Sequence, residues 1–486
     1  MNLRRIVLAV LAIGALGSSA ADARRPNVIF ILADDLGYGD VGCYGQKKVK
    51  TPHIDQLAAE GMRFTQFYSG SPVCASSRCA LLTGRHMGHA YIRDNRATPP
   101  EGQWPLREGE TTVADVLRGA GYRTACVGKW GLGGPGSVGE PGRHGFDHFF
   151  GYLCQSMAHR FYPEYLWRNS DKVALPQNAG GARGAPYSHD LMTREALELV
   201  TKWAGDERPF FLYLAYTVPH FDLDVPEDSM APYKALGWAD PPAPPKSDNY
   251  RPQPTPRAAY AGMVSRMDRD IGALMGLLKE KQIDEHTLVV FSSDNGPTHL
   301  PALDVKFFES AGPLRGLKGS VYEGGIRVPF IARWPGRIAA GKTSDFVGAF
   351  WDVLPTLAEL SGAEPGRPVG TDGVSFVPTL LGIGERGPGE ANGQRGQRPH
   401  EYLYWEQGGY GGNQAVRLGD WKGVRTGLRK NANAPVELYN LKSDVAESRD
   451  VAKENPDLVR RIEQVMKDAR TESPEFPLFA PRKPAN

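Results

Sequence analysis

The stretch Asn27-Val28-Ile29-Phe30-Ile31-Leu32-Ala33 is apolar at every position after the first and ends abruptly at Asp34-Asp35. A short run of this kind, rich in β-branched residues, is typical of a strand that is buried on both faces of a parallel sheet. The two carboxylates therefore stand just past the carboxyl end of a predicted strand. Open α/β sheets bind their ligands at that edge, so the stretch predicts both the fold class and the location of the chemistry.

The same pattern continues along the chain. Apolar strands are expected at 62–68, 122–127, 209–217 and 287–293, and helices at 52–60, 111–118, 194–203 and 260–281. The first of these helices has Thr51 as its cap, Pro52 in its first turn and Gly61 just past its end. Strands that alternate with helices predict an α/β sandwich, in which helices flank a large and mostly parallel sheet.

The pattern changes near residue 385. Gly419-Asp420 separates two short apolar runs, 415–418 and 421–424, and predicts a two-residue hairpin. A further strand is expected at 436–439 and a helix at 456–470. We therefore divide the chain into a leader at 1–23, a large α/β domain at 24–384 and a C-terminal α+β subdomain with an antiparallel sheet at 385–486. The Pro-rich stretch 240–256 and the Gly-rich stretch 382–399 are expected to be connections.

The overall charge is nearly balanced. The chain has 57 Lys plus Arg against 55 Asp plus Glu, which gives a net charge of +2. Such a balance argues against a protein that binds nucleic acid or a membrane surface through bulk charge. Any anion must then be bound locally, by a few well-placed groups.

The first 23 residues are typical of an export signal. Arg4 and Arg5 precede an apolar stretch at 6–16, and Ala21-Asp22-Ala23 offers a cleavage site between small residues. An apolar run of about 11 residues is too short to span a bilayer, so we expect cleavage and no membrane insertion. The mature protein is expected to be secreted or periplasmic.

Two polar pairs follow predicted buried strands: Asp34-Asp35 and Asp294-Asn295. Adjacent carboxylates repel one another and are costly to bury unless a cation compensates them. Either pair alone would be explained by a solvated turn, but two such pairs at strand ends favour a metal site. Because all four donors are oxygens, they suit Ca²⁺ or Mg²⁺ better than zinc.

The chain has five cysteines, at 43, 74, 79, 126 and 154, so at least one lies outside any intramolecular disulfide. Cys126 falls inside an apolar strand and is expected to be a small buried residue. Cys74 precedes a short predicted helix, with Arg78 one turn later. A helix N-terminus would lower the pKa of a thiol or bind an anion, although a structural cysteine explains this segment equally well on its own.

The segment around Cys74 resembles the signature of type I sulfatases, a family of the alkaline phosphatase superfamily. Cys-x-Pro-Ser-Arg with a Leu-x-Thr-Gly-Arg-like tail is matched by Cys74-Ala75-Ser76-Ser77-Arg78 and Leu81-Leu82-Thr83-Gly84-Arg85. Further matches occur in the family's order, at Asp34-Asp35, Gly128-Lys129-Trp130, Val218-Pro219-His220, Ser293-Asp294-Asn295-Gly296, 314–319, 322–325 and 437–441. Each is weak alone, but together they identify the chain as a member of the family.

The resemblance implies an alkaline-phosphatase-like fold and a sulfuric ester hydrolase whose catalytic domain is 24–384. Cys74 would be oxidised to formylglycine by a sulfatase-maturating enzyme and then hydrated. One hydroxyl of the hydrate would attack sulfur and expel the alcohol, and the second would allow sulfate to leave.

The resemblance also assigns roles to individual side chains. Ca²⁺ would be bound by Asp34, Asp35, Cys74, Asp294 and Asn295. Arg78 would hold the formylglycine hydroxyl. Lys129, His220 and Lys318 would contact the sulfate oxygens, and one of them, or a nearby histidine, would protonate the leaving oxygen.

Two residues depart from the family's pattern. Ser76 replaces the proline of the signature, which leaves open which system oxidises Cys74. Gly131 stands where many members carry a histidine two residues after the lysine. Gln155 or His159 is expected to fill that space and bind substrate, although His159 would equally suit a pocket wall or the surface.

The substrate is less clearly indicated than the reaction. An aromatic-rich stretch (Tyr152, Phe161, Tyr162, Tyr165 and Trp167) favours a sulfated carbohydrate, since sugars stack on aromatic rings, but simple packing would also explain it. An aryl sulfate stays open. Two other functions also stay open: a phosphonate or phosphate ester hydrolase of the same superfamily, against which the amide of Asn295 argues, and an inactive sulfoglycan-binding relative.

Overall fold

The computed structural model describes residues 25–183, 186–241, 251–298, 304–363, 370–384 and 396–479. The predicted leader at 1–23 and most of both predicted connections lie outside these ranges. No helix within them is both long and apolar enough to cross a bilayer.

Ten strands form the main sheet. They are β1 (Asn27–Ala33), β2 (Met62–Phe64), β4 (Arg123–Lys129), β5 (His148–Tyr152), β6 (Tyr165–Arg168), β7 (Asp171–Ala174), β8 (Phe210–Ala215), β9 (Thr287–Ser293), β10 (Phe330–Arg333) and β11 (Lys342–Ser344). Their order across the sheet is β11-β2-β10-β9-β1-β8-β4-β5-β6-β7. The central five, from β9 to β5, are parallel. The prediction of an α/β sandwich with a large, mostly parallel sheet is confirmed.

The edges of the sheet differ from the prediction. β10 runs antiparallel to both β9 and β2, and β5, β6 and β7 form an antiparallel meander. The single strand expected at 62–68 is two strands, because its second part, β3 (Phe67–Tyr68), leaves the main sheet and pairs with β12 (Gly348–Ala349). Neither β10 nor the meander was predicted from the sequence.

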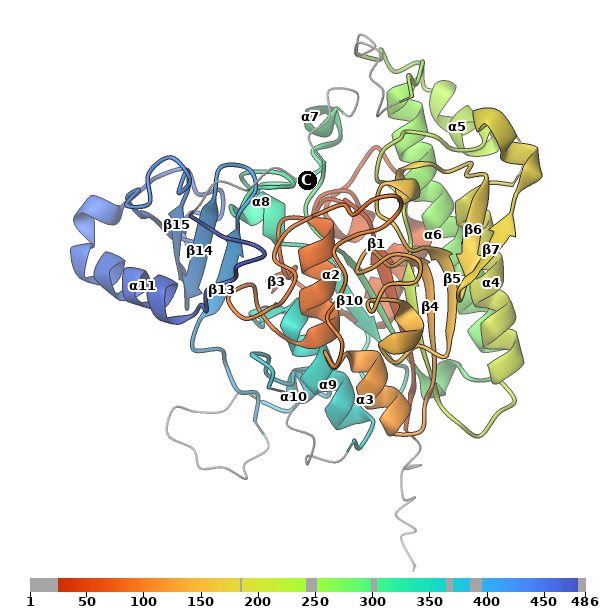
Figure 1. Ribbon diagram of the computed structural model, residues 1–486, viewed down its shortest axis with the longest axis horizontal. Coiled ribbons are helices and arrows are strands. Elements are labelled where there is room, and N and C mark those ends of the chain that lie inside the picture. Colours follow the sequence, from red (N-terminus) through yellow and green to blue (C-terminus); the bar gives the residue numbers. More distant parts are fainter. Residues whose placement is uncertain are drawn as a thin grey trace, which may run out of the picture.

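Helices cover both faces of the sheet (Figure 1). Val28, Phe30 and Leu32 of β1 pack in the same core as α2 (Cys74–Thr83), α3 (Val113–Gly119) and α9 (Val353–Leu360). The alternate residues Ile29 and Ile31 pack in a second core with α1 (Pro52–Glu60), α4 (Ser188–Trp203) and α6 (Pro256–Glu280). Both faces of β1 are therefore buried, which explains its continuous apolar sequence. The remaining short helices of this domain are α5 (Glu227–Lys234), α7 (Val305–Phe308), α8 (Glu323–Ile326) and α10 (Val377–Leu380).

A separate antiparallel sheet follows, drawn in blue in Figure 1. It contains β13 (Leu403–Gln407), β14 (Asn413–Leu418), β15 (Trp421–Arg425) and β16 (Glu437–Asn440), in that order. α11 (Pro456–Asp468) packs on one face through Ile462 and Met466. The predicted hairpin is present, with Leu418 opposite Trp421, whereas β13 was not predicted. The proposed boundary between 384 and 385 adjoins residues outside the described ranges and stays a prediction.

Buried charges join the small sheet to the large domain. The Lys422 ammonium on β15 lies 2.8 Å from Glu323 Oε1 and 2.9 Å from Glu447 Oε1, and all three side chains are fully buried. Glu323 begins α8, and its N–H donates to Glu447 Oε2 at 2.7 Å. Because the loss of one partner would leave a buried charge uncompensated, this network fixes the small sheet against the segment that follows Lys318.

Candidate active site

The carboxyl ends of the central strands bring together residues that are far apart in the sequence. Asp34 follows β1, Lys129 ends β4, and Asp294 follows β9. The Asp294 N–H donates to the Ala33 carbonyl at 3.1 Å, so the two acidic segments lie side by side. The side chains of Asp34, Asp35, Asp294 and Asn295 are all at most 1% exposed. The four oxygen-bearing residues expected at this edge therefore do meet there.

Cys74 begins α2 and faces this acidic edge. Its Sγ lies 3.6 Å from Asp34 Oδ1 and 3.9 Å from Asp35 Oδ1. Burial raises the pKa of the thiol, and the nearby lysines only partly oppose that rise. The sequence had suggested that the helix N-terminus would lower this pKa. That suggestion is wrong, because the site is fully desolvated and lies next to carboxylates. In the part of the chain that the structure describes, all five cysteines are free.

Three cations neutralise the three carboxylates. Lys129 Nζ lies 2.7 Å from Asp34 Oδ2, and Lys318 Nζ lies 2.7 Å from Asp35 Oδ2. Arg78, one turn into α2, donates to Asp294 Oδ2 from Nη2 at 2.8 Å and from Nε at 3.1 Å. Burial raises the pKa of Asp294 to about 6, and the charge of Asp34 adds to this rise. The arrangement is balanced in charge but holds six ionisable groups out of water.

The donor set fits a hard divalent cation. Asn295 donates from Nδ2 to Asp35 Oδ1 at 2.7 Å, while its buried Oδ1 has no hydrogen-bond partner within the described residues. Asp34, Asp35, Cys74 and His220, which we call the active-site cluster, offer ligand atoms within 4.8 Å of one another. An unpartnered amide oxygen beside two carboxylates is a ligand arrangement typical of Ca²⁺. Asp294 is less free to bind, because Arg78 and the Asp35 N–H already occupy its oxygens.

Two histidines form the wall of the site. The rings of His159 and His220 stack with centroids 4.3 Å apart. The Nδ1 of His220 lies 2.5 Å from the Phe221 carbonyl, which places a proton on Nδ1 and turns Nε2 toward Asp35 Oδ2, 3.4 Å away. Burial lowers the pKa of His220, and it lowers that of His159 to about 3. Burial therefore favours the neutral form of both rings.

Gln155 is the side chain nearest to the space beside Gly131. A Cβ at Gly131 would lie 3.0 Å from Gln155 Cγ. The Gln155 amide donates to Asn95 Oδ1 at 3.1 Å, and the same oxygen accepts from the Ala75 N–H at 2.9 Å. Asn95 thus links Gln155 to the first turn of α2. Sequence reasoning missed Asn95, and no motif or periodicity marked it.

Ser76 replaces the family's proline without leaving its polar group unpaired. The buried Ser76 hydroxyl donates to Ser71 Oγ at 2.7 Å, so it connects the loop before α2 to the helix.

The predicted aromatic contact surface is largely packing. Tyr152, Phe161 and Trp167 are 2%, 1% and 8% exposed and lie in the cores. Tyr165 and Trp167 both donate to Glu101. The sugar-stacking interpretation is therefore wrong for the three buried rings. Tyr152 ends β5 and Trp167 lies in β6, while Phe161, in the connection between these strands, packs in the core.

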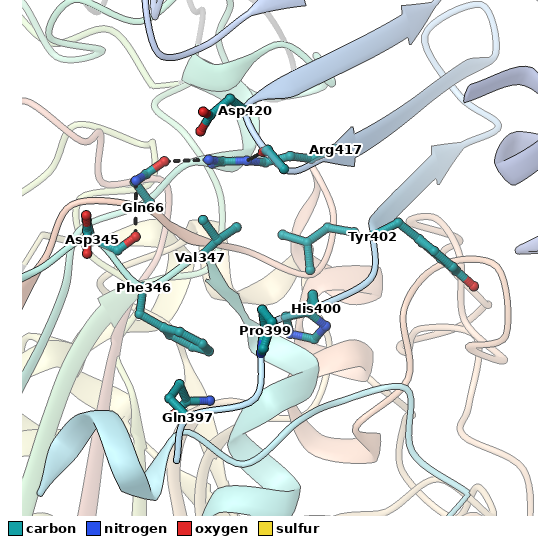
Figure 2. Close-up of a pocket in the computed structure, with 12 residues that line it drawn as sticks. Gln66, Asp345, Phe346, Val347, Gln397, Pro399, His400, Tyr402, Arg417 and Asp420 are labelled. Carbon is teal, nitrogen blue, oxygen red and sulfur yellow. Dashed lines mark hydrogen bonds between the residues drawn. The ribbon is translucent and has the colours of Figure 1, made fainter. Parts of the chain in front are cut away.

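A cavity of about 260 Å³ lies between the small sheet and the large domain and does not include the active-site cluster (Figure 2). Arg417, on its wall, donates to Gln66 Oε1 at 2.5 Å, and His400 pairs with Asp352 at 2.9 Å. These polar groups satisfy one another, and none of the residues predicted to act in catalysis lines the cavity.

A second group of ligand-type side chains, the peripheral cluster, consists of His86, His89 and Asp372. It lies beyond the C-terminal end of α2, whereas Cys74 begins that helix. Asp372 Oδ1 pairs with His89 Nδ1 at 2.8 Å, and Asp372 Oδ2 accepts from the His86 N–H at 3.0 Å. The Gly88 N–H donates to His86 Nδ1 at 3.1 Å. The carboxylate and the buried imidazole nitrogen therefore already have partners.

Comparisons with known proteins agree with this geometry. A family model described as Sulfatase matches residues 26–363. N-acetylgalactosamine-6-sulfatase of Canis lupus familiaris is 32% identical over 443 residues, which cover 86% of this chain and 74% of that protein. Arylsulfatase A of Homo sapiens is 36% identical over 395 residues, covering 76% and 71%. The crystal structure of Ps i-CgsB in complex with k-i-k-neocarrahexaose has a TM-score of 0.72 at 29% identity, covering 91% and 92%.

Proposed function

Because the chain belongs to the sulfatase family and is a sulfuric ester hydrolase, we propose that it removes sulfate from a sulfated carbohydrate, using a nucleophile derived from Cys74 and a bound Ca²⁺. The observation that carries this proposal is the convergence of Cys74, three carboxylates and three cations at one edge of the sheet. The substrate class rests on the similar proteins: the name of the canine relative specifies a sugar sulfate, and Ps i-CgsB was crystallised with a neocarrahexaose.

Oxidation of Cys74 to formylglycine, followed by hydration, would supply a hydroxyl nucleophile and a second hydroxyl that allows sulfate to leave. The buried thiol, with its raised pKa, would be a poor nucleophile by itself. Since Cys74 is 1% exposed, a maturating enzyme would have to reach it before the chain folds. Arg78, held by Asp294 and by the Lys129 carbonyl, would fix the orientation of residue 74.

Asp34, Asp35, Asp294 and Asn295, with residue 74, would hold Ca²⁺, which would polarise the sulfate and favour an ionised nucleophile. The charge balance supports this assignment. The three cations already neutralise the three carboxylates, so a divalent cation leaves the site positive. An excess of positive charge is suited to a sulfate ester anion and an ionised hydroxyl together.

Lys129 and Lys318 would turn from their carboxylates to donate hydrogen bonds to the sulfate oxygens. Lys318 is our candidate to protonate the leaving oxygen, because its ammonium lies against Asp35 beside residue 74. His220, whose Nε2 faces Asp35, would contact the sulfate and could act as an acid only after it takes up a second proton. The protein would act outside the cytoplasm, in the secreted or periplasmic location that residues 1–23 predict.

A substrate screen tests the proposal. The mature protein, produced with a sulfatase-maturating enzyme, is assayed for sulfate release from defined sulfated saccharides and a simple aryl sulfate, and for phosphate release from the matching phosphate esters. We expect turnover of at least one sulfated saccharide, and faster release of sulfate than of phosphate. Faster phosphate ester hydrolysis, or no release from any sulfate ester by fully matured protein, would overturn it.

A further inference from the structure

A short loop of the small sheet reaches the active site. Residues 408–412 join β13 to β14, and Tyr410 stands at the centre of the sequence Gly-Gly-Tyr-Gly-Gly. Its side chain is 59% exposed, the highest value among the exposed large hydrophobic residues in the described part of the chain. Much of the ring surface is therefore available for contact with a ligand.

The ring lies against the segment that carries Lys318. A Cβ at Gly319 would come within 2.8 to 2.9 Å of three Tyr410 ring atoms, so only glycine lets the ring approach this closely. The Gly319 N–H donates to the Pro72 carbonyl at 2.8 Å, which ties this segment to the loop before Cys74. Burial raises the pKa of Tyr410, Lys318 lowers it, and Cys74 and Asp35 raise it further, so these active-site groups all lie within electrostatic reach of the phenol.

The loop holds the ring in place. The Gly409 N–H donates to Asp94 Oδ2 at 2.7 Å, and the Gly412 N–H donates to the Gly409 carbonyl at 3.0 Å. Tyr410 itself has a φ of 50°, a left-handed conformation that is uncommon for a residue with a side chain. Two hydrogen bonds thus constrain the turn that carries the tyrosine, which reduces the conformational freedom lost when a ligand contacts the ring.

We propose that Tyr410 is a specificity-determining residue, whose ring stacks on the apolar face of the sugar that carries the sulfate. This inference rests on the proposed function and specifies how the carbohydrate, as distinct from the sulfate, is recognised. The sulfate would lie between Lys129, Lys318 and residue 74, and the sugar attached to it would lie toward Tyr410. An aromatic ring offers a sugar a broad apolar contact.

Four proteins test the role of the ring: the wild type, Tyr410→Phe, Tyr410→Ala and Leu236→Ala. Leu236 is a matched control, because it is 57% exposed and belongs to no part of the site described above. We expect Tyr410→Ala to raise KM for the preferred sulfated saccharide roughly tenfold with kcat within about twofold, while Tyr410→Phe and Leu236→Ala match the wild type. Inhibition by inorganic sulfate should be the same in all four proteins, because sulfate alone does not reach the ring.

The readouts separate failure of this inference from failure of the proposed function. An unchanged KM in Tyr410→Ala, or an equal weakening of inorganic sulfate inhibition, would overturn the inference while the enzyme remains a saccharide sulfatase. If the wild type released no sulfate from any saccharide, the proposed function would fail. Calorimetric binding of the same saccharide to Cys74→Ala, with and without Tyr410→Ala, then still decides the role of the ring: a tenfold weaker Kd supports it, and an equal Kd contradicts it.

Discussion

The active-site cluster and the peripheral cluster use similar ligand-type side chains, but their polar groups are satisfied to different degrees. In the peripheral cluster one carboxylate lies between two imidazoles, and hydrogen bonds occupy both of its oxygens. The active-site cluster places two carboxylates and a thiol in contact, and beside it the Asn295 Oδ1 is buried without a partner in the described residues. The peripheral cluster satisfies its own polar groups, whereas the active-site cluster presents ligand atoms that fit a metal ion.

This difference indicates that the two clusters have different roles. The peripheral cluster joins the loop after α2 to the segment around Asp372. The Asp372 N–H adds a further link between them, because it donates to the Gly84 carbonyl at 2.9 Å. We expect the peripheral cluster to stabilise the fold by holding these two segments together. Buried groups that lack partners, or that bear like charges in contact, are costly to maintain and cluster at functional sites. We therefore expect the active-site cluster to control activity and metal binding, and the peripheral cluster to control stability.

The largest expected effect comes from Cys74→Ala. Removal of the nucleophile should lower kcat by about 10⁴-fold or more, as in other enzymes with covalent catalysis. The fold should be retained, since the substituted residue lies at the start of α2 and alanine fits there. Sulfate release and circular dichroism measure both. His86→Ala is the matched variant in the peripheral cluster and should leave kcat nearly unchanged. Comparable losses of kcat in the two folded variants would contradict the assignment of activity to the active-site cluster alone.

Removal of the metal ranks second. Dialysis against a chelator should abolish sulfate release, and Ca²⁺ should restore it together with a higher Tm. Free Ca²⁺ at 100 times its Kd would stabilise the folded protein by about 2.7 kcal/mol. Asn295→Leu removes the unpartnered oxygen without removing a charge, so it should raise the Ca²⁺ concentration needed for the Tm shift at least tenfold. The same shift in Asn295→Leu as in the wild type would contradict the assignment.

A pH effect on stability should arise from His86. Burial lowers the pKa of His86 to about 4, from 6.5 in the unfolded chain. Between these values the unfolded chain binds a proton that the folded protein does not, so acidification favours unfolding. The free energy of unfolding should fall by about 3 kcal/mol from this residue as the pH drops from 6.5 to 4. Urea unfolding should show that the free energy of unfolding of His86→Gln depends less on pH than that of the wild type. The same pH dependence in both proteins would contradict the role of His86.

The smallest expected effect is that of Asp372→Asn. It weakens the charge-assisted hydrogen bond to His89 but leaves a partly exposed amide of the same shape. A loss of about 1–2 kcal/mol in the free energy of unfolding should follow, with kcat within about twofold of the wild type. Denaturant unfolding and sulfate release measure the two quantities. A large drop in kcat at full folding would show that this cluster does more than hold the loop.

Strand ends with polar pairs were predictable because they are local features of the sequence. The apolar run before Asp34-Asp35 and the similar run before Asp294-Asn295 both predicted strands that end at the same edge, and parallel order then brings them together. The hairpin at Gly419-Asp420 was predictable for the same reason. In each case the sequence pattern lies within about ten consecutive residues.

Features that depend on distant contacts were not predictable. The aromatic residues at 165 and 167 were taken for a loop, because β6 is a four-residue strand that forms only against its neighbours. Asp372 completes the peripheral cluster from a segment far along the chain from His86. Tyr410 lies against Gly319, next to Lys318, although 91 positions separate residues 319 and 410; buried charges join the small sheet to the large domain nearby. The raised pKa of Cys74 likewise depends on burial, which the helix start alone did not indicate.

Mass spectrometry of the peptide that carries residue 74, combined with a sulfate-release assay on the same preparation, tests the central claim most directly. We expect that peptide to be lighter than the thiol form by about 18 Da, the difference between a cysteine and an aldehyde. The converted fraction should be proportional to kcat across preparations made with and without a maturating enzyme. A preparation in which residue 74 is entirely thiol, yet which hydrolyses the sulfate ester at the full rate, would contradict the account.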